Sequence, residues 1–471
     1  MLKKINSKIE CVSLVVILIF THLKKTSILF IIFLFHFSSD MSAQEGFRFL
    51  DKTKKKQRVN FKLINNLIVI PLEINGRKLS FILDSGVNKT ILFNISQNDS
   101  IDLKNVEKVD LQGLGSGKPV KALVSKNNSL KIKGLGSKNE TIFVILEDYF
   151  DLSAKMGTTI HGIVGYNVLK NFVVKINYKT KKIYFYNPDK FTLSKCKKCE
   201  VFPIQFYRRK PFINAQVQLD TIGNTLTDVK LLIDSGGSDA IWLFENTKEV
   251  IKTPKSFFLD ILGEGLSGSI YGNRSRIPKI KLKSFELEKP TVSFLDSISS
   301  VNALKFKERN GSIGSDILKR FTVWFDYPSR QFMLKKNGSF KKEFNYDMSG
   351  LNVIYNGTQL VKEKETSKIT GAYNQQSNTG SSNNSVNFIA SFSYRFKPSY
   401  RIKTVVKGSP ADKAGLQTDD IILKINGKNA YEYKLGDIVN KFREKKGKKI
   451  TILIERKGER MKFNFRLERK I

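Results

Sequence analysis

Two segments of the chain place an aspartate at the end of an apolar run and follow it with serine and glycine. The first is Phe81-Ile-Leu-Asp84-Ser-Gly, and the second is Leu231-Leu-Ile-Asp234-Ser-Gly. A carboxylate at the end of a buried strand is costly unless hydrogen bonds or a shared proton compensate for its lost solvation. If the two loops meet, one carboxyl stays ionised and the other keeps its proton, because two close like charges resist joint ionisation. Such a pair can polarise a water molecule and protonate the carbonyl oxygen that the water attacks.

The residues after each aspartate are suited to hold such a pair. Gly86 and Gly236 allow a tight turn and offer backbone N–H groups to the carboxylates. Ser85 and Ser235 can hydrogen-bond across to the opposite loop and thereby fix the geometry of the pair. We therefore expect the two aspartates to be catalytic and these four residues to support them.

Other segments that follow each aspartate also recur along the chain. The segment Ile163-Val-Gly165 corresponds to Ser312-Ile-Gly314, 149 residues later, and the glycine-rich stretch 113–117 corresponds to 263–268. Short β-rich runs bounded by Asn-Gly, Gly-rich and Asn-Pro turns dominate both copies, which is the pattern of an all-β lobe. We therefore expect a mainly β protein whose two equivalent lobes pack around a pseudo-two-fold axis, with each later glycine segment beside an aspartate loop.

The scarcity of histidine and cysteine argues against several other chemistries. The sequence has three His and three Cys, too few for a histidine-rich zinc site, and we expect no metal and no cofactor. His161 is more typical of a turn than of a Ser/His/Asp triad. Cys196 and Cys199 precede a predicted strand, which favours a local disulfide or two free thiols over redox catalysis. Trp242 and Trp324 lie on strand-like runs, where we expect core residues.

The charge balance is strongly basic. The 471 residues include 81 Lys and Arg against 43 Asp and Glu, a formal net charge of +38. The lysines are scattered through every segment, and no zinc-finger, helix-turn-helix or RNA-binding signature accompanies them. We therefore expect a solvated basic surface and no nucleic-acid partner. The alternative, a binder of anionic polymers, predicts tight and steeply salt-dependent binding of nucleic acid.

The N-terminus contains two apolar tracts, residues 11–20 and 28–37, with lysines between them. Each tract is about half of the ~20 residues that a membrane-spanning helix needs. Lys24-Lys25, the second tract and the small-residue stretch 38–43 together have the pattern of a signal peptide, and translation would then start near Leu23. We expect a leader at residues 1–43 and export, to the periplasm or cell envelope of a bacterium. The alternative is an uncleaved leader that anchors the chain in the inner membrane.

The pattern changes after about residue 345. A stretch rich in Ser, Asn, Gly and Gln predicts a disordered insertion near residues 357–393. Beyond it, the segments 407–416 and 420–427 resemble PDZ domains of bacterial exported proteases, which bind a peptide as an added strand and hold its terminal carboxylate with backbone N–H groups. The resemblance implies that Ser349-Gly350-Leu351 is the carboxylate-binding loop and that residues 435–445 form the groove helix. The partners would be protein C-termini or extended peptides.

Residues 60–340 resemble the pepsin and retroviral group of aspartic proteases, in the bacterial form with two retropepsin-like units on one chain. The resemblance rests on the two Asp-Ser-Gly segments and on the later glycine segments. It implies that Asp84 and Asp234 are the catalytic pair and that the glycine-rich stretches are hairpins that cover the substrate. Both motifs have Ser where Thr is frequent in this group. No flap tyrosine is obvious in the first copy, and Tyr271 is the candidate in the second.

Together these features predict four parts: a leader at 1–43, an N-terminal protease lobe at 44–195, a C-terminal protease lobe at 196–344 and a PDZ domain at 345–471. The predicted function is that of an exported aspartic endopeptidase, which hydrolyses polypeptide substrates through a water molecule activated by the aspartate pair. The PDZ domain would bind polypeptide ends or regulate access. The alternative is a non-catalytic peptide-binding scaffold, a pseudoprotease whose carboxyl pair is misaligned.

Overall fold

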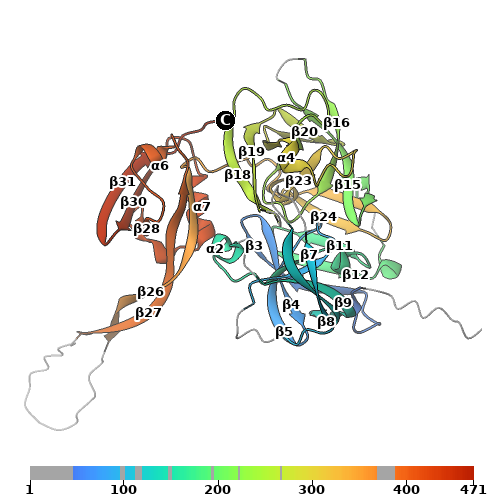
Figure 1. Ribbon diagram of the computed structural model, residues 1–471, viewed down its shortest axis with the longest axis horizontal. Coiled ribbons are helices and arrows are strands. Elements are labelled where there is room, and N and C mark those ends of the chain that lie inside the picture. Colours follow the sequence, from blue (N-terminus) through green and yellow to red (C-terminus); the bar gives the residue numbers. More distant parts are fainter. Residues whose placement is uncertain are drawn as a thin grey trace, which may run out of the picture. The chain divides into compact units, whose positions relative to one another are not determined.

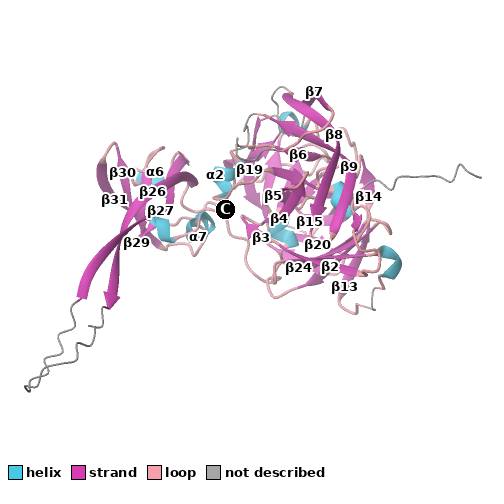
Figure 2. Ribbon diagram, turned by 90° about the horizontal axis from the view of Figure 1, so that it is seen from below, coloured by secondary structure: helices cyan, strands magenta, loops and turns pink. Residues whose placement is uncertain are grey.

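The structure is a computed structural model, and it describes residues 46–471 apart from 96–100, 112–118, 147–150, 193–195, 221–222, 266–267 and 369–387. The predicted leader, residues 1–43, lies outside the described residues. Strands dominate the described part and the helices are short (Figure 2), which confirms the mainly β class. None of the described helices is long and apolar enough to cross a membrane.

The first repeat folds into a nine-stranded sheet, drawn in blue and teal in Figure 1. Its strands run in the order β1-β9-β6-β10-β5-β4-β8-β7, and β3 pairs with β4. They are β1 (Arg48–Phe49), β3 (Lys62–Ile64), β4 (Leu67–Ile74), β5 (Arg77–Leu83), β6 (Thr90–Leu92), β7 (Val106–Leu111), β8 (Val120–Ile132), β9 (Leu135–Ile145) and β10 (Gly162–Val164). Asn75 and Gly76 join β4 to β5 with φ of 46° and 91°, the backbone that a two-residue hairpin requires.

The second repeat forms a ten-stranded sheet in the order β18-β19-β22-β17-β23-β16-β15-β20-β21, with β14 paired to β15. Its strands are β14 (Gln205–Tyr207), β15 (Lys210–Gln218), β16 (Thr227–Ile233), β17 (Ile241–Phe244), β18 (Phe258–Gly265), β19 (Gly268–Arg276), β20 (Lys279–Leu282), β21 (Phe285–Glu288), β22 (Thr291–Leu295) and β23 (Gly311–Ile313). The central strands β22-β17-β23-β16-β15 repeat the order of β9-β6-β10-β5-β4, with the same parallel and antiparallel neighbours. The sequence repeat is therefore a repeat of topology.

The two repeats share a six-stranded sheet with the order β13-β25-β24-β11-β12-β2. Its strands are β2 (Lys56–Asn60), β11 (Val173–Asn177), β12 (Lys182–Tyr186), β13 (Cys199–Pro203), β24 (Phe321–Asp326) and β25 (Gln331–Lys336). The central pair, β11 and β24, joins one repeat to the other as antiparallel neighbours, with Lys175 opposite Trp324. One continuous apolar core extends from Phe47 to Phe344, so the two lobes form a single folded body.

The C-terminal part has its own core, which includes Tyr346, Ile402, Ile438 and Ile452. Its sheet has the order β26-β27-β28-β30-β31, with β29 beside β28, and it carries two helices (orange to red in Figure 1). These elements are β26 (Leu351–Lys368), β27 (Phe388–Val405), α6 (Pro410–Lys413), β28 (Ile421–Ile425), β29 (Lys428–Asn429), α7 (Leu435–Phe442), β30 (Lys449–Arg456) and β31 (Glu459–Arg466). Ser409 caps α6 through a hydrogen bond from the Asp412 amide (3.3 Å).

Part of the insertion that the sequence predicts to be disordered, residues 357–393, forms paired strands. Strands β26 and β27 continue as a two-stranded ribbon from the pair Thr358–Pro398 to the pair Lys368–Phe388, inside the span expected to be disordered. Phe392, Tyr394 and Phe396 alternate with polar residues there and stay more than half exposed. The paired segments lie almost entirely outside the stretch rich in Ser, Asn, Gly and Gln, and their alternation is that of a strand. Residues 369–387 lie outside the described part.

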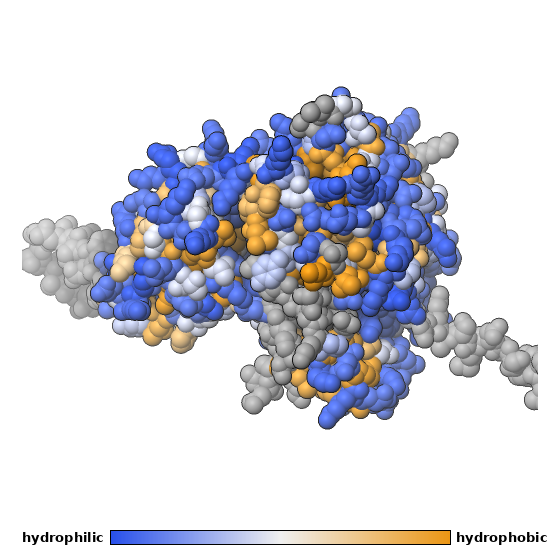
Figure 3. All heavy atoms as spheres, turned by 45° about the horizontal axis from the view of Figure 1, so that its top comes forward, coloured by the Kyte–Doolittle hydropathy of each residue, from blue (hydrophilic) through white to orange (hydrophobic). Residues whose placement is uncertain are grey.

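The short helices of the repeats occupy corresponding places. The first repeat has the helical turn α3 (Tyr166–Leu169), and the second has α5 (Ser315–Leu318) 149 residues later. The others are α2 (Leu152–Met156), α4 (Ser297–Ser300), and the 3-10 turns η1 (Pro188–Lys190) and η2 (Ala430–Glu432). The face drawn in Figure 3 is mostly hydrophilic, with hydrophobic residues in separate patches.

Candidate active site

Each aspartate of the two motifs lies at the end of a central strand. Asp84 follows β5, and its amide donates to the carbonyl of Val164 (2.8 Å) on β10. Asp234 follows β16, and its amide donates to the carbonyl of Ile313 (2.9 Å) on β23. Both neighbouring pairs are parallel, so the later glycine segments run beside the aspartate loops as the sequence predicts.

The glycines of these neighbouring segments are required by close backbone contact. A Cβ atom on Gly165 would lie 2.0 Å from the carbonyl oxygen of Asp84. A Cβ atom on Gly314 would lie 2.3 Å from the carbonyl oxygen of Asp239. Because real side chains do not approach backbone that closely, any other residue would push the aspartate loops aside.

The two carboxyls meet between the lobes. A Cβ atom on Gly86 would lie 3.2 Å from Asp84 Oδ1 and also 3.2 Å from Asp234 Oδ1, so the two carboxyls are neighbours. The Gly86 amide donates to Asp84 Oδ1 (2.6 Å), and the Gly236 amide donates to Asp234 Oδ1 (3.0 Å). A Cβ atom on Gly236 would lie 2.2 Å from Asp84 Cγ, so the opposite loop closes directly on the carboxyl.

The two serines bind the loops to each other. The amide of Ser85 donates to Ser235 Oγ (2.9 Å), and the amide of Ser235 donates to Ser85 Oγ (3.0 Å). Each hydroxyl in turn donates to a carbonyl of the opposite repeat, Ser85 Oγ to Ile233 (2.7 Å) and Ser235 Oγ to Leu83 (2.9 Å). Both serines are buried, so these four bonds are shielded from water.

Burial and the neighbouring carboxylate determine where the shared proton resides. Desolvation, followed by repulsion from Asp234, raises the pKa of Asp84 to about 8, although the Gly86 amide opposes the shift. Asp84 therefore holds its proton more firmly than a free aspartic acid does. This arrangement provides an acid and a base within one site, without a metal ligand.

Sequence reasoning missed a polar network beside Asp234. Asp239 accepts hydrogen bonds from the indole of Trp242 (2.8 Å) and from the guanidinium of Arg274 (3.2 Å), and Arg274 Nε also donates to Asp260 (2.7 Å). Trp242 was expected in the core, but it is only partly buried and its indole is hydrogen-bonded to Asp239. Trp324 is buried, as expected. A cavity of about 10 Å³, lined by Asp234, Asp239 and Trp242 among others, has room for about one water molecule.

The predicted covering hairpins are described only in part. The stretch 113–117 of the first copy lies outside the described residues. In the second copy, β18 and β19 form a hairpin between 258 and 276, and Tyr271 is 49% exposed on it. The hairpin strands are tied to the aspartate loop through Arg274 and Asp239 (3.2 Å).

Two other candidates have structural roles. His161 Nδ1 accepts a hydrogen bond from the Ser80 amide (3.1 Å), which fixes it against β5. Cys196 and Cys199 form a disulfide, and Cys199 begins strand β13, so no helix follows the pair as a redox motif would require.

The predicted carboxylate-binding loop of the C-terminal domain is already occupied by a side chain. The Asp347 carboxylate accepts hydrogen bonds from the amides of Ser349 (2.8 Å) and Gly350 (2.9 Å), and the Leu351 amide donates to Ser349 Oγ (3.0 Å). Burial raises the pKa of Asp347 to about 6. Strand β26 is an edge of its sheet, with α7 packed near it, which is the arrangement that the resemblance implied.

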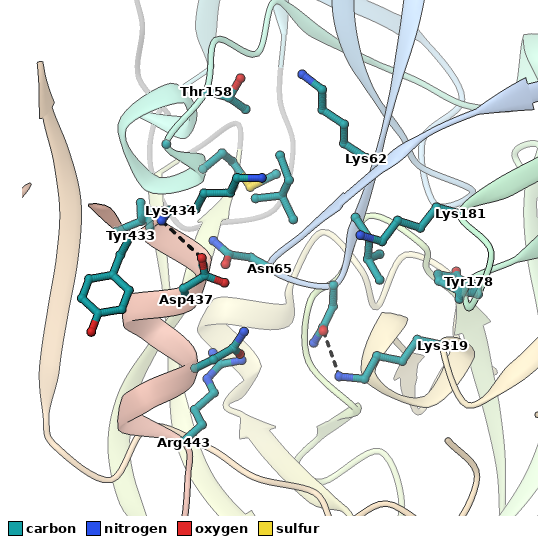
Figure 4. Close-up of a pocket in the computed structure, with 18 of the residues that line it drawn as sticks. Lys62, Asn65, Thr158, Tyr178, Lys181, Lys319, Tyr433, Lys434, Asp437 and Arg443 are labelled. Carbon is teal, nitrogen blue, oxygen red and sulfur yellow. Dashed lines mark hydrogen bonds between the residues drawn. The ribbon is translucent and has the colours of Figure 1, made fainter. Parts of the chain in front are cut away.

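A larger cleft, of about 1070 Å³, lies apart from the carboxyl pair (Figure 4). Its lining comes from both repeats and from the C-terminal domain, and neither Asp84 nor Asp234 takes part in it. Within it, Lys319 Nζ donates to Asn66 Oδ1 (2.9 Å). Its wall is rich in basic side chains, which include Lys62, Lys181, Lys319, Lys434 and Arg443.

Two family models match the chain. Residues 70–168 match the model described as aspartyl protease, a segment that contains Asp84 and its neighbour strand β10. Residues 401–456 match the model described as PDZ domain, a segment that contains α6, α7 and strands β28 to β30. The matches support a protease with a PDZ domain, in agreement with the resemblances drawn from the motifs.

Curated relatives match over short segments. A probable CtpA-like serine protease of Staphylococcus saprophyticus is 46% identical over 59 residues, which is 12% of this chain and 12% of that protein. The carboxy-terminal processing protease CtpB of Bacillus subtilis is 41% identical over 63 residues, 13% of each chain. The chain therefore spans only about an eighth of the length of these relatives. Among solved structures, an aspartic proteinase from Irpex lacteus aligns with 12% identity and a TM-score of 0.41, covering 61% of this chain and 98% of that one.

Proposed function

We propose that this chain is an aspartic endopeptidase in which Asp84 and Asp234 activate a water molecule. The observation that carries the proposal is the adjacency of the two carboxyls, with one carboxyl supplied by each repeat. The reciprocal serine bonds and the aspartyl protease match over residues 70–168 support it. The substrates are polypeptides.

The proton held on Asp84 assigns the first roles. Asp234, as carboxylate, takes a proton from the water as its oxygen attacks the peptide carbonyl carbon, while Asp84 donates its proton to the carbonyl oxygen. In the second step, Asp84 recovers a proton from the gem-diol and Asp234 gives its proton to the leaving nitrogen as the C–N bond breaks. The pair returns to its starting state, so no further reagent is consumed.

One of the two curated relatives is named a serine protease, and a Ser/His/Asp triad is one form of that chemistry that the described residues do not support. Their matches extend over 59 and 63 residues of this chain. In the described part the only histidine is His161, and its Nδ1 is engaged by the Ser80 amide. A Ser/His/Asp triad needs a histidine that is free to accept a proton from the serine.

The test is turnover of a peptide library by the folded chain without its leader. Asp84→Asn and Asp234→Asn should each abolish hydrolysis, nearly as completely as the double variant, because the two groups act as a unit. Asp110→Asn is the matched control, since this carboxylate is exposed and pairs with the exposed Lys121 (2.9 Å). Hydrolysis that survives either dyad substitution would refute the proposal. No hydrolysis by the wild type, with intact peptide binding, would favour the non-catalytic scaffold.

We propose further that the PDZ domain binds extended peptides along the edge of β26. The PDZ match and the edge position of this strand support the proposal. A terminal carboxylate would have to replace Asp347 at the Ser349 and Gly350 amides. Asp347→Ala should therefore tighten binding of a peptide with a free C-terminus and leave its amidated form unchanged, as measured by fluorescence anisotropy. Equal binding of both peptides to Asp347→Ala would rule out carboxylate recognition.

Export is also a proposal. The leader pattern at residues 1–43 and the Cys196–Cys199 disulfide support it, because disulfides persist mainly in oxidising compartments. Fractionation of expressing bacteria, with N-terminal sequencing of the product, tests it. A full-length chain confined to the cytoplasm would contradict it, and a full-length chain in the membrane would indicate an uncleaved anchor.

A further inference from the structure

The two aspartates have different neighbours on the adjacent strand. In the first repeat, Val69 pairs with Ile82, so the register places Leu67 opposite Asp84. In the second repeat, Phe212 pairs with Leu232, so the register places Lys210 opposite Asp234. An apolar side chain at one carboxyl is thus replaced by an ammonium group at the other.

The side chains around Leu67 also differ from those around Lys210. Leu67 belongs to a wholly apolar cluster that includes Val69, Ile82 and Ile91. Side chains two residues apart on a strand share a face, so Lys210 lies on the face of Phe212. That face carries a small aromatic cluster, in which Phe306 stacks on Tyr207 with a centroid distance of 4.5 Å.

Arg309 adds a second positive charge near Lys210. Arg309 is 5% exposed, and its guanidinium lies 5.8 Å from the ring centroid of Phe212 and 4.9 Å from that of Phe244. Its Nε donates to the Gly311 carbonyl (3.1 Å), which is neutral. In the described part of the chain, neither Lys210 nor Arg309 has a carboxylate within salt-bridge distance. The positive charges of both act on Asp234, and that of Lys210 also acts on Asp84.

Two cations therefore share a site with only one ionised carboxylate. A partly buried cation without a partner is unfavourable, whereas an added carboxylate would satisfy it with a charge-assisted hydrogen bond. The apolar cluster on the first-lobe side offers no such partner. The two sides of the carboxyl pair thus differ in the side chains that they would accept.

We propose that Lys210 is a specificity-determining residue and that the endopeptidase selects an acidic side chain beside the scissile bond. The acidic residue binds on the second-lobe side, against Lys210, and the buried charge of Arg309 adds to the attraction; an apolar residue binds on the first-lobe side, against Leu67. This inference rests on the proposed peptidase function.

The experiment compares two peptides that differ only beside the scissile bond, Leu-Glu against Leu-Gln, together with the reversed pairs. The ratio of kcat/KM for Glu over Gln should be about tenfold or more in the wild type and close to one in Lys210→Gln. Lys210→Leu, which copies the first lobe, should behave like Lys210→Gln and covers the case in which one of them folds poorly. Lys78→Gln, an exposed lysine of β5, is the matched control and should keep the wild-type ratio.

The ratio of kcat/KM for the Glu and Gln peptides distinguishes a role of Lys210 in specificity from a role in setting the pKa of the carboxyl pair. If Lys210→Gln shifts the pH profile for both peptides and leaves their ratio unchanged, Lys210 only tunes the pair and the inference is wrong. Equal cleavage of Glu and Gln peptides by the wild type would also overturn it while leaving the peptidase proposal intact.

If no peptide is cleaved, binding decides the question. Anisotropy with the same peptides on Asp84→Asn should then show preference for Glu, lost when Lys210→Gln is added, and equal affinities would overturn the inference. In that outcome the peptidase proposal fails separately, because it requires turnover by the wild type.

Discussion

The two lobes have the same backbone plan but differ in the side chains around it. Both place an aspartate at the end of a central strand beside a glycine segment, and both lock it with a serine from the other lobe. Five residues after each aspartate, however, the first lobe has Lys89, over the ring of Phe143, and the second has Asp239, bound to Arg274. The comparison indicates that the groups holding the carboxyls are kept symmetric, whereas the groups around them are free to diverge.

Substitutions of Gly165 and Gly314, the two glycines in contact with the aspartate loops, should have the largest effects, and these effects should be equal in the two lobes. Gly165→Val and Gly314→Val should both prevent folding, because each Cβ would lie within 2.3 Å of a backbone oxygen. Circular dichroism and soluble yield measure the effect. Alanine at Gly263, where a Cβ meets nothing within 4 Å, is the control and should fold normally. A well-folded Gly165→Val variant would show that the contact can relax.

The protonated carboxyl gives the pair a pH limit. Turnover should fall about tenfold per pH unit above about 8, where Asp84 loses its proton and can no longer act as the acid. The contribution of Asp84 to stability has the same sign: because its folded-state pKa exceeds its unfolded value of 3.8, this contribution is complete at low pH and is lost as the pH rises toward 8. Urea melts between pH 4 and 9 measure this decrease, which Asp84→Asn should reduce. Turnover that is level through pH 9 would contradict the assignment of the proton.

The reciprocal serine bonds predict equal losses in the two lobes. Ser85→Ala and Ser235→Ala should each lower the free energy of unfolding by about 3 kcal/mol, because each leaves a buried amide and a buried carbonyl of the opposite lobe without a partner. No bond joins the two hydroxyls, so each substitution removes a different pair of bonds and the double variant should lose about the sum of the two. Denaturant unfolding measures all three variants. A loss confined to one serine would break the symmetry.

Asp239 and Lys89 occupy corresponding positions in the two lobes but differ in chemistry. Substitutions there should therefore lower the free energy of unfolding by unequal and smaller amounts. Asp239→Asn should cost about 2 kcal/mol, because Arg274 is 9% exposed and would keep only Asp260 as its acidic partner. Lys89→Gln should change stability by less than about 0.5 kcal/mol, since Lys89 is exposed. Thermal or urea unfolding of the two variants checks the difference. Equal effects would mean that the two positions have not diverged in role.

The sequence predicted the parts of this fold that depend on repetition and on local chemistry. Asp84 and Asp234 could be matched because the motif recurs with its apolar run, and Ser85 and Ser235 follow from what a hydroxyl can reach. Lys210 could not be matched, because its distance along the chain from Asp234 differs from that of Leu67 from Asp84, and only the pairing of β15 with β16 brings it alongside. Asp347 was missed for a similar reason, since its role depends on a turn that the sequence does not specify.

The pairing of β11 with β24 has a consequence for biosynthesis. These strands come from opposite repeats, and the second of them ends only at Asp326. A nascent chain that has exposed the first repeat alone carries a single carboxyl and an unpaired sheet edge. The ribosome must therefore release most of the polypeptide before the two halves can close on each other, which delays the appearance of a working carboxyl pair until synthesis is well advanced.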